Sequence, residues 1–311
     1  MFINILFASD TNVRKFLIKI LKKNSFTYKI SLGIYRFYLS LHTKIEKFFH
    51  KKKILGRLKN RKKIDFKTLY YGKLKGSEKA SHMEKLLLSQ IERFKRTGQE
   101  KFMLLEIGTY MGESLELFGN ILNKNLRNYL IVAIDPYSEF ASEKDIEKKN
   151  VNYEMSKEIE KIYLYYLHNV SLMNWRENMI HIRKNSSEGL KLVQDLKLSW
   201  DFIYIDGSHY YEGIKHDFLK SKELIKKIDN YKGIISGDDF ELEINECKKY
   251  GYSKDEFKKF LQDKKEVDYL IMEKNKGLGF HPGITLYFSE INDTITKTQS
   301  GFWYLDNIQN N

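Results

Sequence analysis

The amino-acid sequence predicts an α/β fold in which a mostly parallel sheet is covered by helices. From about residue 65 onward, short apolar stretches of strand length alternate with stretches that repeat apolar residues at helical spacing, which is the pattern of such a sheet. Within this part, Leu104–Ser114 reads as an apolar strand that turns through two glycines into a helix. A chain of 311 residues is also long enough for one large α/β domain with an appendage.

Seven strands and their connecting helices follow from this alternation. The five strands of the core are predicted at Phe102–Ile107, Tyr129–Asp135, Met179–Arg183, Trp200–Asp206 and Gly233–Asp238. Two later strands are predicted at Val267–Met272 and Ile284–Phe288. The helices are expected at His82–Lys95, capped by Ser81, and then at Glu113–Leu122, Ser187–Leu196, Tyr210–Ile228 and Lys254–Gln262.

The connection between the second and third strands, Tyr137–Asn178, is unusually long and contains a helical pattern at Glu154–Leu172. Compact α/β folds rarely need so many residues between strands. Long connections at the carboxyl edge of a sheet usually cover the ligand crevice, so we expect a substrate lid here. A peripheral helix without a role in substrate binding is the alternative.

The first 64 residues differ in charge from the rest of the chain. They contain seventeen Lys or Arg residues and two acidic residues, a net charge of +15; since the whole chain carries +13, the remainder carries −2. Apolar and basic residues alternate at helical spacing from Asn12 to Phe49, and Lys51–Lys63 is a basic linker. We therefore expect a basic amphipathic helical arm over residues 1–64 and a folded domain over residues 65–311. The arm suits an anionic membrane surface or a protein partner, or packing on its own domain or a second subunit.

The composition argues against a chain embedded in a membrane. Charged residues make up 31% of the sequence, and no apolar run reaches the about eighteen residues of a spanning helix. The apolar start lacks a basic region and a small-residue cleavage site, so no secretory signal is expected. Cys247 is the only cysteine, so no intramolecular disulfide can form and a cytoplasmic location is expected, peripheral to the inner membrane face if the arm binds there. The oligomeric state stays open, a homo-oligomer included.

The stretch Leu104–Ser114 carries the strongest chemical signal. Its strand ends in Glu106 and turns through Gly108 and Gly112 into a helix. Glycine lets the backbone approach a ligand closely, and the free N–H groups of the helix start suit an anionic group. A dinucleotide site would prefer G-x-G-x-x-G, whereas this turn has G-x-x-x-G with an acidic residue two positions before the first glycine. The pattern therefore argues against NAD as the ligand.

Two further positions can complete a cofactor site. Asp135 stands 27 residues after Gly108 at the end of the neighbouring strand, where a carboxylate can accept both hydroxyls of a ribose. The same residue also reads as an ordinary Asp before a loop. After the third strand, Ser186 and Ser187 either cap the next helix or hydrogen-bond adenine.

Two buried strands end in carboxylates. One ends in Asp206, and the other ends in Asp238, which is followed by Asp239. The fourth and fifth strands of a doubly wound sheet are adjacent, so the three side chains are expected to converge at its carboxyl edge. Three anions repel one another unless a cation lies among them, and an all-oxygen cluster suits Mg²⁺, Mn²⁺ or Ca²⁺ rather than zinc. The alternative is that one or two of them only cap helices.

His209 lies three residues after Asp206 and beside the same crevice. An imidazole titrates near neutrality, so His209 is the candidate general base for a hydroxyl proton. The alternative is an ordinary surface or core histidine. His216 is expected on the surface of the following helix, and His281, at the turn into the last predicted strand, is a weaker candidate for the site.

These motifs resemble a known family. Leu104–Ser114, with Tyr110 in its turn, is similar to the first motif of the metal-dependent O-methyltransferases of the catechol and caffeoyl-CoA type. The stretch 205–217, the Asp238 and Asp239 pair and the stretch 280–288 extend the resemblance to a bacterial branch. That branch contains the macrolide-sugar methyltransferases and the cephalosporin hydroxylase-like proteins, and the resemblance covers about residues 80–305.

The resemblance implies a Rossmann-like class I methyltransferase with strand order 3-2-1-4-5-7-6, the last strand antiparallel, and S-adenosylmethionine as cofactor. Together with the positions above, it places the cofactor on Glu106, Gly108, Tyr110, Gly112, Ser114, Asp135 and Ser186. It makes Asp206, Asp238 and Asp239 ligands of a divalent cation, Mg²⁺ being expected, and puts His209 where the family has a basic lysine. The implied reaction is in-line transfer of the methyl group to a hydroxyl of a small molecule, sugar or surface polysaccharide.

Two other functions fit parts of the sequence. A nucleic-acid methyltransferase could use the basic arm as a phosphate clamp, but the rest of the chain is nearly neutral and lacks an N/D-P-P-Y tetrapeptide. A non-catalytic module could keep the fold and bind a partner through the arm. The presence of Glu106, Asp135 and the three clustered aspartates argues against such a module.

Overall fold

The computed structural model of the protein describes residues 63–64, 74–138, 156–228, 230–272 and 278–305. The chain divides into two compact units, Met1–Lys63 and Ile64–Asn311. Residues 1–62, and with them almost all of the predicted basic arm, lie outside the described residues. Ile64 is fully buried in the second unit, where its amide donates to Oδ1 of Asn169 at 3.1 Å.

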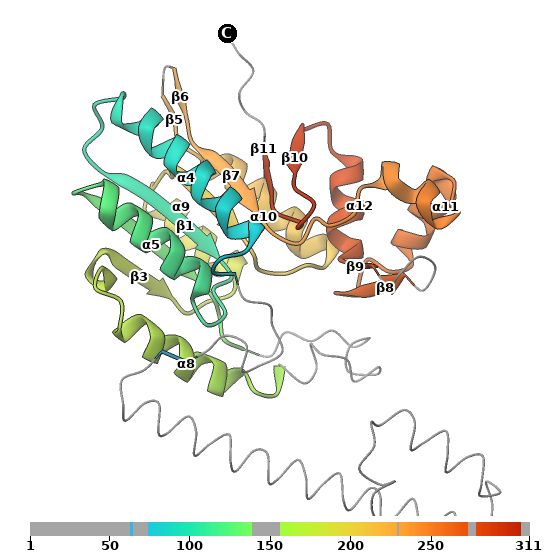
Figure 1. Cartoon of the computed structure of the whole chain (residues 1–311), viewed down its shortest axis with the longest axis horizontal. Helices are drawn as coiled ribbons and strands as arrows, with labels where there is room; N and C mark the ends of the chain where they lie inside the picture. Colours follow the sequence, from blue (N-terminus) through green and yellow to red (C-terminus); the bar gives the residue numbers. More distant parts are fainter. Residues whose placement is uncertain (1–62, 65–73, 139–155, 229, 273–277, 306–311) are drawn as a thin grey trace, which may run out of the picture. The chain divides into compact units, whose positions relative to one another are not determined.

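A seven-stranded sheet forms the centre of the second unit (Figure 1). Its strands are β1 (Phe102–Ile107), β2 (Tyr129–Ile134), β3 (Met179–Ile182), β4 (Phe202–Ile205), β7 (Ile234–Gly237), β10 (Ile295–Lys297) and β11 (Trp303–Leu305). The order across the sheet is β3-β2-β1-β4-β7-β11-β10. The first five of these are parallel, and β11 runs antiparallel to both of its neighbours. Counted along the chain, this is the order 3-2-1-4-5-7-6 that the resemblance implies.

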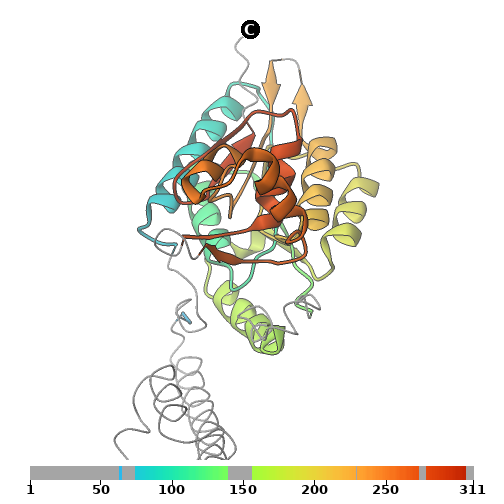
Figure 2. The same cartoon turned by 90° about the vertical axis from the view of Figure 1, so that its right-hand side faces the viewer.

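Helices cover both faces of the sheet (Figures 1 and 2). The α-helices are α4 (Glu78–Lys95), α5 (Glu113–Asn125), α8 (Ile159–Ser171), α9 (Ser186–Asp195), α10 (Tyr211–Leu224), α11 (Lys254–Gln262) and α12 (Pro282–Glu290), with short 3-10 helices at Arg176–Asn178 (η2) and Ile244–Tyr250 (η3). The pair α4 and α5 lies on one face, and the pair α9 and α10 lies on the other. No helix in these described stretches combines the length and the apolarity needed to cross a membrane.

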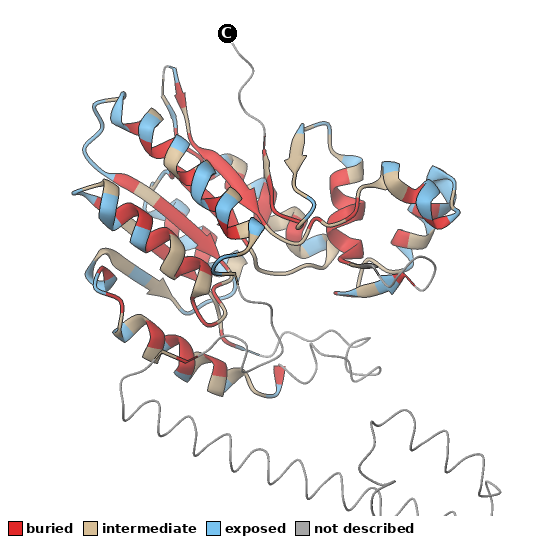
Figure 3. Ribbon diagram, in the orientation of Figure 1, coloured by how far each residue is buried: buried red, intermediate tan, exposed pale blue. Residues whose placement is uncertain are grey.

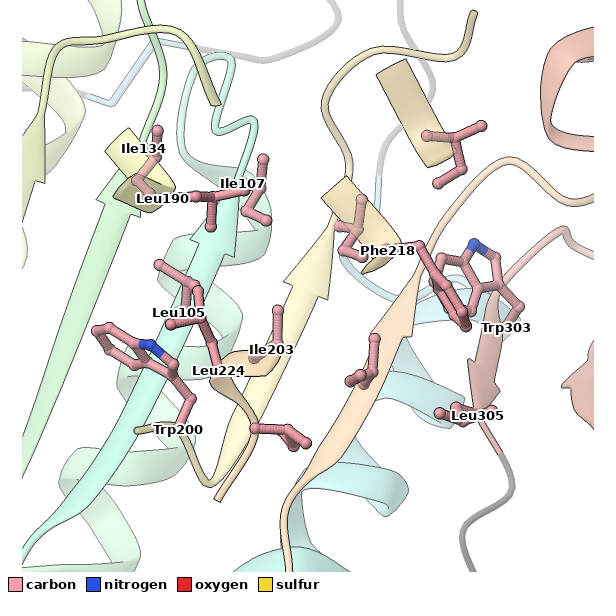
Figure 4. Packing of buried hydrophobic residues seen from close by; sticks show 14 of the residues in the cluster. Leu105, Ile107, Ile134, Leu190, Trp200, Ile203, Phe218, Leu224, Trp303 and Leu305 are labelled. Carbon is pink, nitrogen blue, oxygen red and sulfur yellow. The ribbon is translucent and has the colours of Figure 1, made fainter. Parts of the chain in front are cut away.

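The two faces of the sheet bury different sets of side chains. On the first face, Phe94 of α4 meets Phe102 edge-on at a centroid distance of 5.2 Å, and Phe118 of α5 meets Phe202 at 5.5 Å. On the second face, strand side chains pack against α9, α10 and β11 in one cluster (Figure 4), which includes Leu105, Ile107, Ile134, Ile203, Leu190, Phe218, Leu224 and Trp303. Strands β4 and β7 are therefore buried along their whole length (Figure 3), as expected for parallel strands covered on both sides.

One of the two late strands is predicted wrongly, and the other is only partly extended and lies outside the main sheet. The apolar run Ile284–Phe288 lies in helix α12, which begins at Pro282. Proline fits the first turn of a helix, and a short apolar run does not by itself distinguish a buried strand from a buried helix. Strands β10 and β11 take the last two places in the sheet instead.

The region between β7 and α12 forms a smaller substructure of its own. Within the predicted strand Val267–Met272, only Leu270–Met272 is extended, as β8, and it pairs with β9 (Leu278–Phe280) outside the main sheet. Together with η3 and α11, it surrounds a second apolar cluster that includes Phe257, Leu261 and Phe280. This substructure carries side chains to the carboxyl edge of the main sheet.

Several helix ends differ from the prediction, and three of the differences have a visible cause. Helix α4 begins earlier, because Ser77 rather than Ser81 is its cap and accepts from the amide of Ala80 at 3.1 Å. Helix α9 is capped by Asn185, so neither Ser186 nor Ser187 is its cap. Helix α10 ends at Leu224 instead of reaching 228, since Lys227–Ile228 (β5) pairs with Tyr231–Lys232 (β6).

Candidate active site at the carboxyl edge of the sheet

The turn after β1 has the backbone conformation that its glycines permit. Gly108 and Gly112 have φ values of 82° and 84°, and Tyr110 between them has a φ of 46°. A Cβ atom on Gly108 would overlap the backbone carbonyl of Asp206. Glycine at this position therefore lets the turn pack directly against the end of β4.

Asp135 lies beside this turn, as the sequence predicts, and it also holds the turn in place. Its Oδ2 accepts from the backbone amides of Thr109 at 2.8 Å and Tyr110 at 3.1 Å, and its Oδ1 accepts from the amide of Tyr137 at 2.9 Å. Both acceptor positions of Oδ2 are therefore occupied, whereas Oδ1 keeps one further position. Asp135 therefore holds the turn in place and can still accept a hydrogen bond from a ribose.

Glu106 and Ser114 meet beneath the turn. The hydroxyl of Ser114 donates to Oε1 of Glu106, whereas Oε2 is buried and has no hydrogen-bond partner among the described residues. Burial raises the pKa of Glu106 well above its usual range, although the Ser114 hydrogen bond opposes the shift. An unpaired buried carboxyl oxygen is costly unless a ligand satisfies it, so this pair is suited to the polar end of a cofactor.

Aromatic residues that the sequence analysis did not identify cover the turn. The hydroxyl of Tyr137 donates to the carbonyl of Tyr110 at 2.6 Å and lies 2.8 Å from Oγ1 of Thr109. Tyr166 of α8 is fully buried against Tyr137, with 5.2 Å between ring centroids. Helix α8 is also tied to the turn by Asn169, which donates to the carbonyl of Met111 at 3.1 Å.

Asp206, Asp238 and Asp239 come together at the ends of β4 and β7. One carboxylate oxygen from each lies within 4.8 Å of the others. Asp239 has a φ of 66°, a conformation uncommon for a residue other than glycine, and its amide donates to Oδ1 of Asp238 at 2.7 Å. Burial, followed by the charge of Asp239, raises the pKa of Asp238 to about 7.

Lys79 is a cation that the sequence analysis did not identify. It lies in the first turn of α4, and its Nζ is 2.6 Å from both carboxylate oxygens of Asp238. The start of α4 is held at this edge because the amide of Lys75 donates to Oε1 of Glu113 at 3.1 Å. Lys79 stands 159 positions before Asp238 in a helix without a motif, so the sequence offered no signal for it.

His209 lies between carboxylates on two sides. Its Nδ1 is 2.9 Å from Oδ1 of Asp268, and its Nε2 is 3.0 Å from Oδ2 of Asp239 and 3.8 Å from Oδ1 of Asp206. Burial alone would lower the pKa of His209, but the charges of Asp268 and Asp239 raise it well above its usual value. Asp268 belongs to the substructure outside the main sheet and stands in no sequence motif that marks it as part of this site.

His281 packs against His209, with 4.5 Å between ring centroids. It is the N-cap residue of α12 rather than part of a turn into a strand, and its Nδ1 lies 3.1 Å from Oε2 of Glu241. Gly283 permits this arrangement, since a Cβ atom there would meet the backbone at His209 and Tyr211. His216 lies on α10, as expected, where its Nδ1 is 2.9 Å from Oδ1 of Asp217.

The residues at this edge fit a divalent cation. Three carboxylates with closely spaced oxygens are the hard ligands that Mg²⁺ and Mn²⁺ prefer. Lys79 already gives Asp238 one positive partner. Even with Lys79 and a protonated His209, the three carboxylates carry one negative charge more than the cationic groups beside them.

Comparison with known proteins gives one match by sequence. A family model described as a methyltransferase domain matches residues 105–240. No curated protein matches the chain. The matched segment contains the glycine turn, Asp135 and all three clustered aspartates.

Solved structures with a similar fold include two O-methyltransferases and one further cofactor-bound protein. The O-methyltransferase NovP is 13% identical over 73% of this chain and 78% of its own, with a TM-score of 0.43. The TDP-rhamnose 3'-O-methyltransferase CalS11 of calicheamicin biosynthesis is 13% identical over 84% and 94%, with a TM-score of 0.37. Cofactor-bound Rv0187 from MTB is 12% identical over 82% and 88%, with a TM-score of 0.39. Likenesses at this level say nothing about the substrate.

The strand order and the match across the site support the same conclusion. The sheet has the order of a class I methyltransferase, and the matched segment runs from β1 to the residue after Asp239. Residues 105–240 thus match a methyltransferase domain, and they lie in a sheet whose strand order is the one that the resemblance to class I methyltransferases implies.

Proposed function

We propose that the protein transfers the methyl group of S-adenosylmethionine to a hydroxyl oxygen of a saccharide or natural-product acceptor, with the help of a divalent cation. The observation that carries this proposal is the group formed by Asp206, Asp238, Asp239 and His209 next to the glycine turn. The acceptor class rests on the sequence resemblance to the macrolide-sugar branch.

The cofactor is proposed to lie over the turn after β1. The helix start at Gly112 would receive the carboxylate of the methionine part, and Glu106 with Ser114 would bind its amino end. Asp135 would accept the ribose hydroxyls. Tyr110 would line the pocket, and Ser186, the first residue of α9, would hydrogen-bond adenine.

The acceptor is proposed to bind at the neighbouring strand ends. Asp206, Asp238 and Asp239 would hold the divalent cation, which would lower the pKa of the acceptor hydroxyl. Despite burial, the charges of Asp268 and Asp239 raise the pKa of His209. A cation bound to Asp239 would offset the charge of that carboxylate, so that Nε2 of His209 could release its proton to solvent and then accept the proton of the acceptor hydroxyl.

The reaction is a single displacement. As the bond from the methyl carbon to sulfur breaks, a bond from that carbon to the acceptor oxygen forms. The acceptor proton passes to Nε2 of His209, and the products are a methyl ether and S-adenosylhomocysteine. Because no covalent intermediate is needed, the main contribution of the protein is alignment of the two reactants.

Two parts of the chain are given supporting roles. Helix α8 packs on the glycine turn through Tyr166 and Asn169, and we assign it to the substrate lid predicted over residues 137–178, of which 139–155 lie outside the described residues. Residues 1–64 are assigned to a basic appendage for an anionic membrane surface. A protein that starts at Ile64 should keep cofactor binding and lose sedimentation with vesicles that contain anionic lipid at low salt. Equal sedimentation of both proteins would contradict this role.

The proposed activity can be tested with radiolabelled S-adenosylmethionine. The acceptors are nucleotide sugars, macrolide glycosides and surface polysaccharide, each with and without chelator. Label is expected in a saccharide fraction and is expected to disappear with chelator. Label that appears only in nucleic acid, or transfer that is unaffected by exhaustive chelation, would contradict the proposal.

A further inference from the structure

Two histidines and one aspartate form a second group of ligand atoms at this edge. His209, Asp239 and His281 each offer one atom, and these atoms lie within 4.8 Å of one another. The group shares Asp239 with the three-aspartate cluster but differs from it in chemistry, because two of its three donors are imidazole nitrogens. Nitrogen donors favour Zn²⁺ and other transition metals over Mg²⁺.

Each histidine is oriented by a carboxylate on its other nitrogen. Nδ1 of His209 is 2.9 Å from Asp268, and Nδ1 of His281 is 3.1 Å from Glu241. Histidines that bind metals nearly always have such a partner, which fixes the ring and makes the remaining nitrogen a better ligand. Nε2 of His281 is 4.0 Å from Oδ2 of Asp268, which is beyond hydrogen-bond distance, so the Nε2 atoms of both histidines can bind a common ligand.

One nitrogen of the pair is also unsatisfied in the fold. Nε2 of His209 is buried and has no hydrogen-bond partner among the described residues, although it lies 3.0 Å from Asp239. His281 is only 7% exposed. Two imidazoles whose centroids are 4.5 Å apart repel each other if both are charged, and a metal ion bound by both would remove that repulsion.

We propose that His209, Asp239 and His281 form a second metal site that binds a transition metal such as Zn²⁺. The site goes beyond the proposed function, because nothing in methyl transfer requires His281. One consequence does rest on the proposed function: Zn²⁺ on His209 would occupy the nitrogen that receives the acceptor proton. Zn²⁺ should therefore inhibit methyl transfer that is supported by Mg²⁺.

Metal binding by the two groups can be distinguished by substituting residues that belong to, or support, only one of them. Zn²⁺ and Mn²⁺ are titrated by calorimetry into the chelator-treated full-length protein and into His281→Gln, Glu241→Gln and Asp206→Asn. We expect His281→Gln to weaken Zn²⁺ binding by at least about tenfold, and Glu241→Gln by about 10- to 100-fold, with Mn²⁺ affinity unchanged. Asp206→Asn should do the reverse, weakening Mn²⁺ and leaving Zn²⁺ binding intact.

His216→Gln is the matched control, because His216 is also paired with a carboxylate, at 2.9 Å, but belongs to neither group. It should leave the affinities for both metals unchanged. Titration with S-adenosylhomocysteine checks that each variant is folded. Equal Zn²⁺ affinity in wild type, His281→Gln and Glu241→Gln would overturn the site. Binding of Zn²⁺ that depends on His281, in a protein that transfers no methyl group, would uphold the site while the proposed function fails.

Discussion

One aspartate lies just before β4 and another just after it, and the surroundings of the two carboxylates differ. Asp201, just before the strand, is fully buried, and its side chain accepts from Nζ of Lys226 at 2.8 Å, the amide of Met103 at 2.7 Å and the hydroxyl of Tyr231 at 2.8 Å. Asp206, just after the strand, lies with two other aspartates.

The difference separates a structural carboxylate from a ligand-binding group. Asp201 has a cation of its own and hydrogen bonds on both oxygens, so a ligand could gain little there. At the opposite end, three carboxylates share the cationic groups of Lys79 and His209. This excess of negative charge lies next to the turn after β1, and it suits the carboxyl edge of the sheet to binding a cation.

The largest effect is expected from Asp238→Ala. This change removes one of the three clustered aspartates and the partner of Lys79, so Mn²⁺ binding and methyl transfer should both fall to background. Affinity for S-adenosylhomocysteine should stay near that of the wild type, because the cofactor is proposed to bind at the turn after β1. Electron paramagnetic resonance of Mn²⁺, a methyl-transfer assay and calorimetry give the three readouts. Full activity in this variant would contradict the role of Asp238 as a cation ligand that methyl transfer requires.

Asp201→Ala should affect stability instead. Lys226, which is 9% exposed, would be left without its partner, and such a change costs about 3–5 kcal/mol of unfolding free energy. Urea denaturation measures the loss. The exposed Asp195→Ala is the control and should stay within about 0.5 kcal/mol of wild type. If Asp201→Ala lost less than about 1 kcal/mol of unfolding free energy, Asp201 would not be a structural carboxylate, and its contrast with Asp206 would fail.

His209→Gln should slow methyl transfer by about 10²–10⁴, the usual contribution of a general base. The deficit should shrink as the pH rises, because the acceptor hydroxyl then loses its proton without help. Rates measured between pH 6 and pH 9 test this. A deficit that does not change with pH would assign His209 to positioning the acceptor.

Lys79→Met should change metal affinity in the opposite direction from Asp238→Ala. Lys79 holds Asp238 at 2.6 Å and would have to give way to a divalent cation, so its loss should raise Mn²⁺ affinity by about tenfold, in line with the strength of a charged hydrogen bond. Lys85→Met, on the exposed side of α4, is the control and should have no effect. Weaker binding of Mn²⁺ to Lys79→Met would show that the lysine supports the cation.

The smallest effect is on the pH dependence of stability. Burial and the charge of Asp239 raise the pKa of Asp238 from its unfolded value to about 7. Between about pH 4 and pH 7, the folded state therefore binds more protons at this group than the unfolded state, and stability falls as the pH rises. With chelator present, Asp238→Asn should lose less stability than wild type between pH 5 and pH 7. Parallel curves would contradict the raised pKa.

The sequence predicts the core of the sheet and the carboxylate cluster because both depend on the ends of apolar strands. Parallel strands end at the same edge, so Asp135, Asp206 and Asp238 could be placed together from their positions alone. The residues that pair with this site, the cation Lys79 and the anion Asp268, could not be placed from the sequence. Lys79 and Asp268 come from segments distant in sequence that carry no motif, and only packing brings them to this edge.

The late part of the chain shows a different limit. Ile284–Phe288 is apolar except for Thr285, and α12 buries all five residues, so neither helical nor strand periodicity appears in its sequence. The two strands that take its place in the sheet, β10 and β11, are three residues each. Elements this short gain their structure from pairing with neighbours rather than from local pattern.

The most direct test of the account is a crystal structure with S-adenosylhomocysteine and Mn²⁺, with anomalous scattering used to locate the metal. We predict an anomalous peak bound by Asp206, Asp238 and Asp239, with the cofactor over the Gly108 turn and its ribose hydroxyls on Asp135. The sulfur should face the metal across the space left for the acceptor. A cofactor bound elsewhere, or an occupied cofactor site with no metal on the three aspartates, would contradict the account.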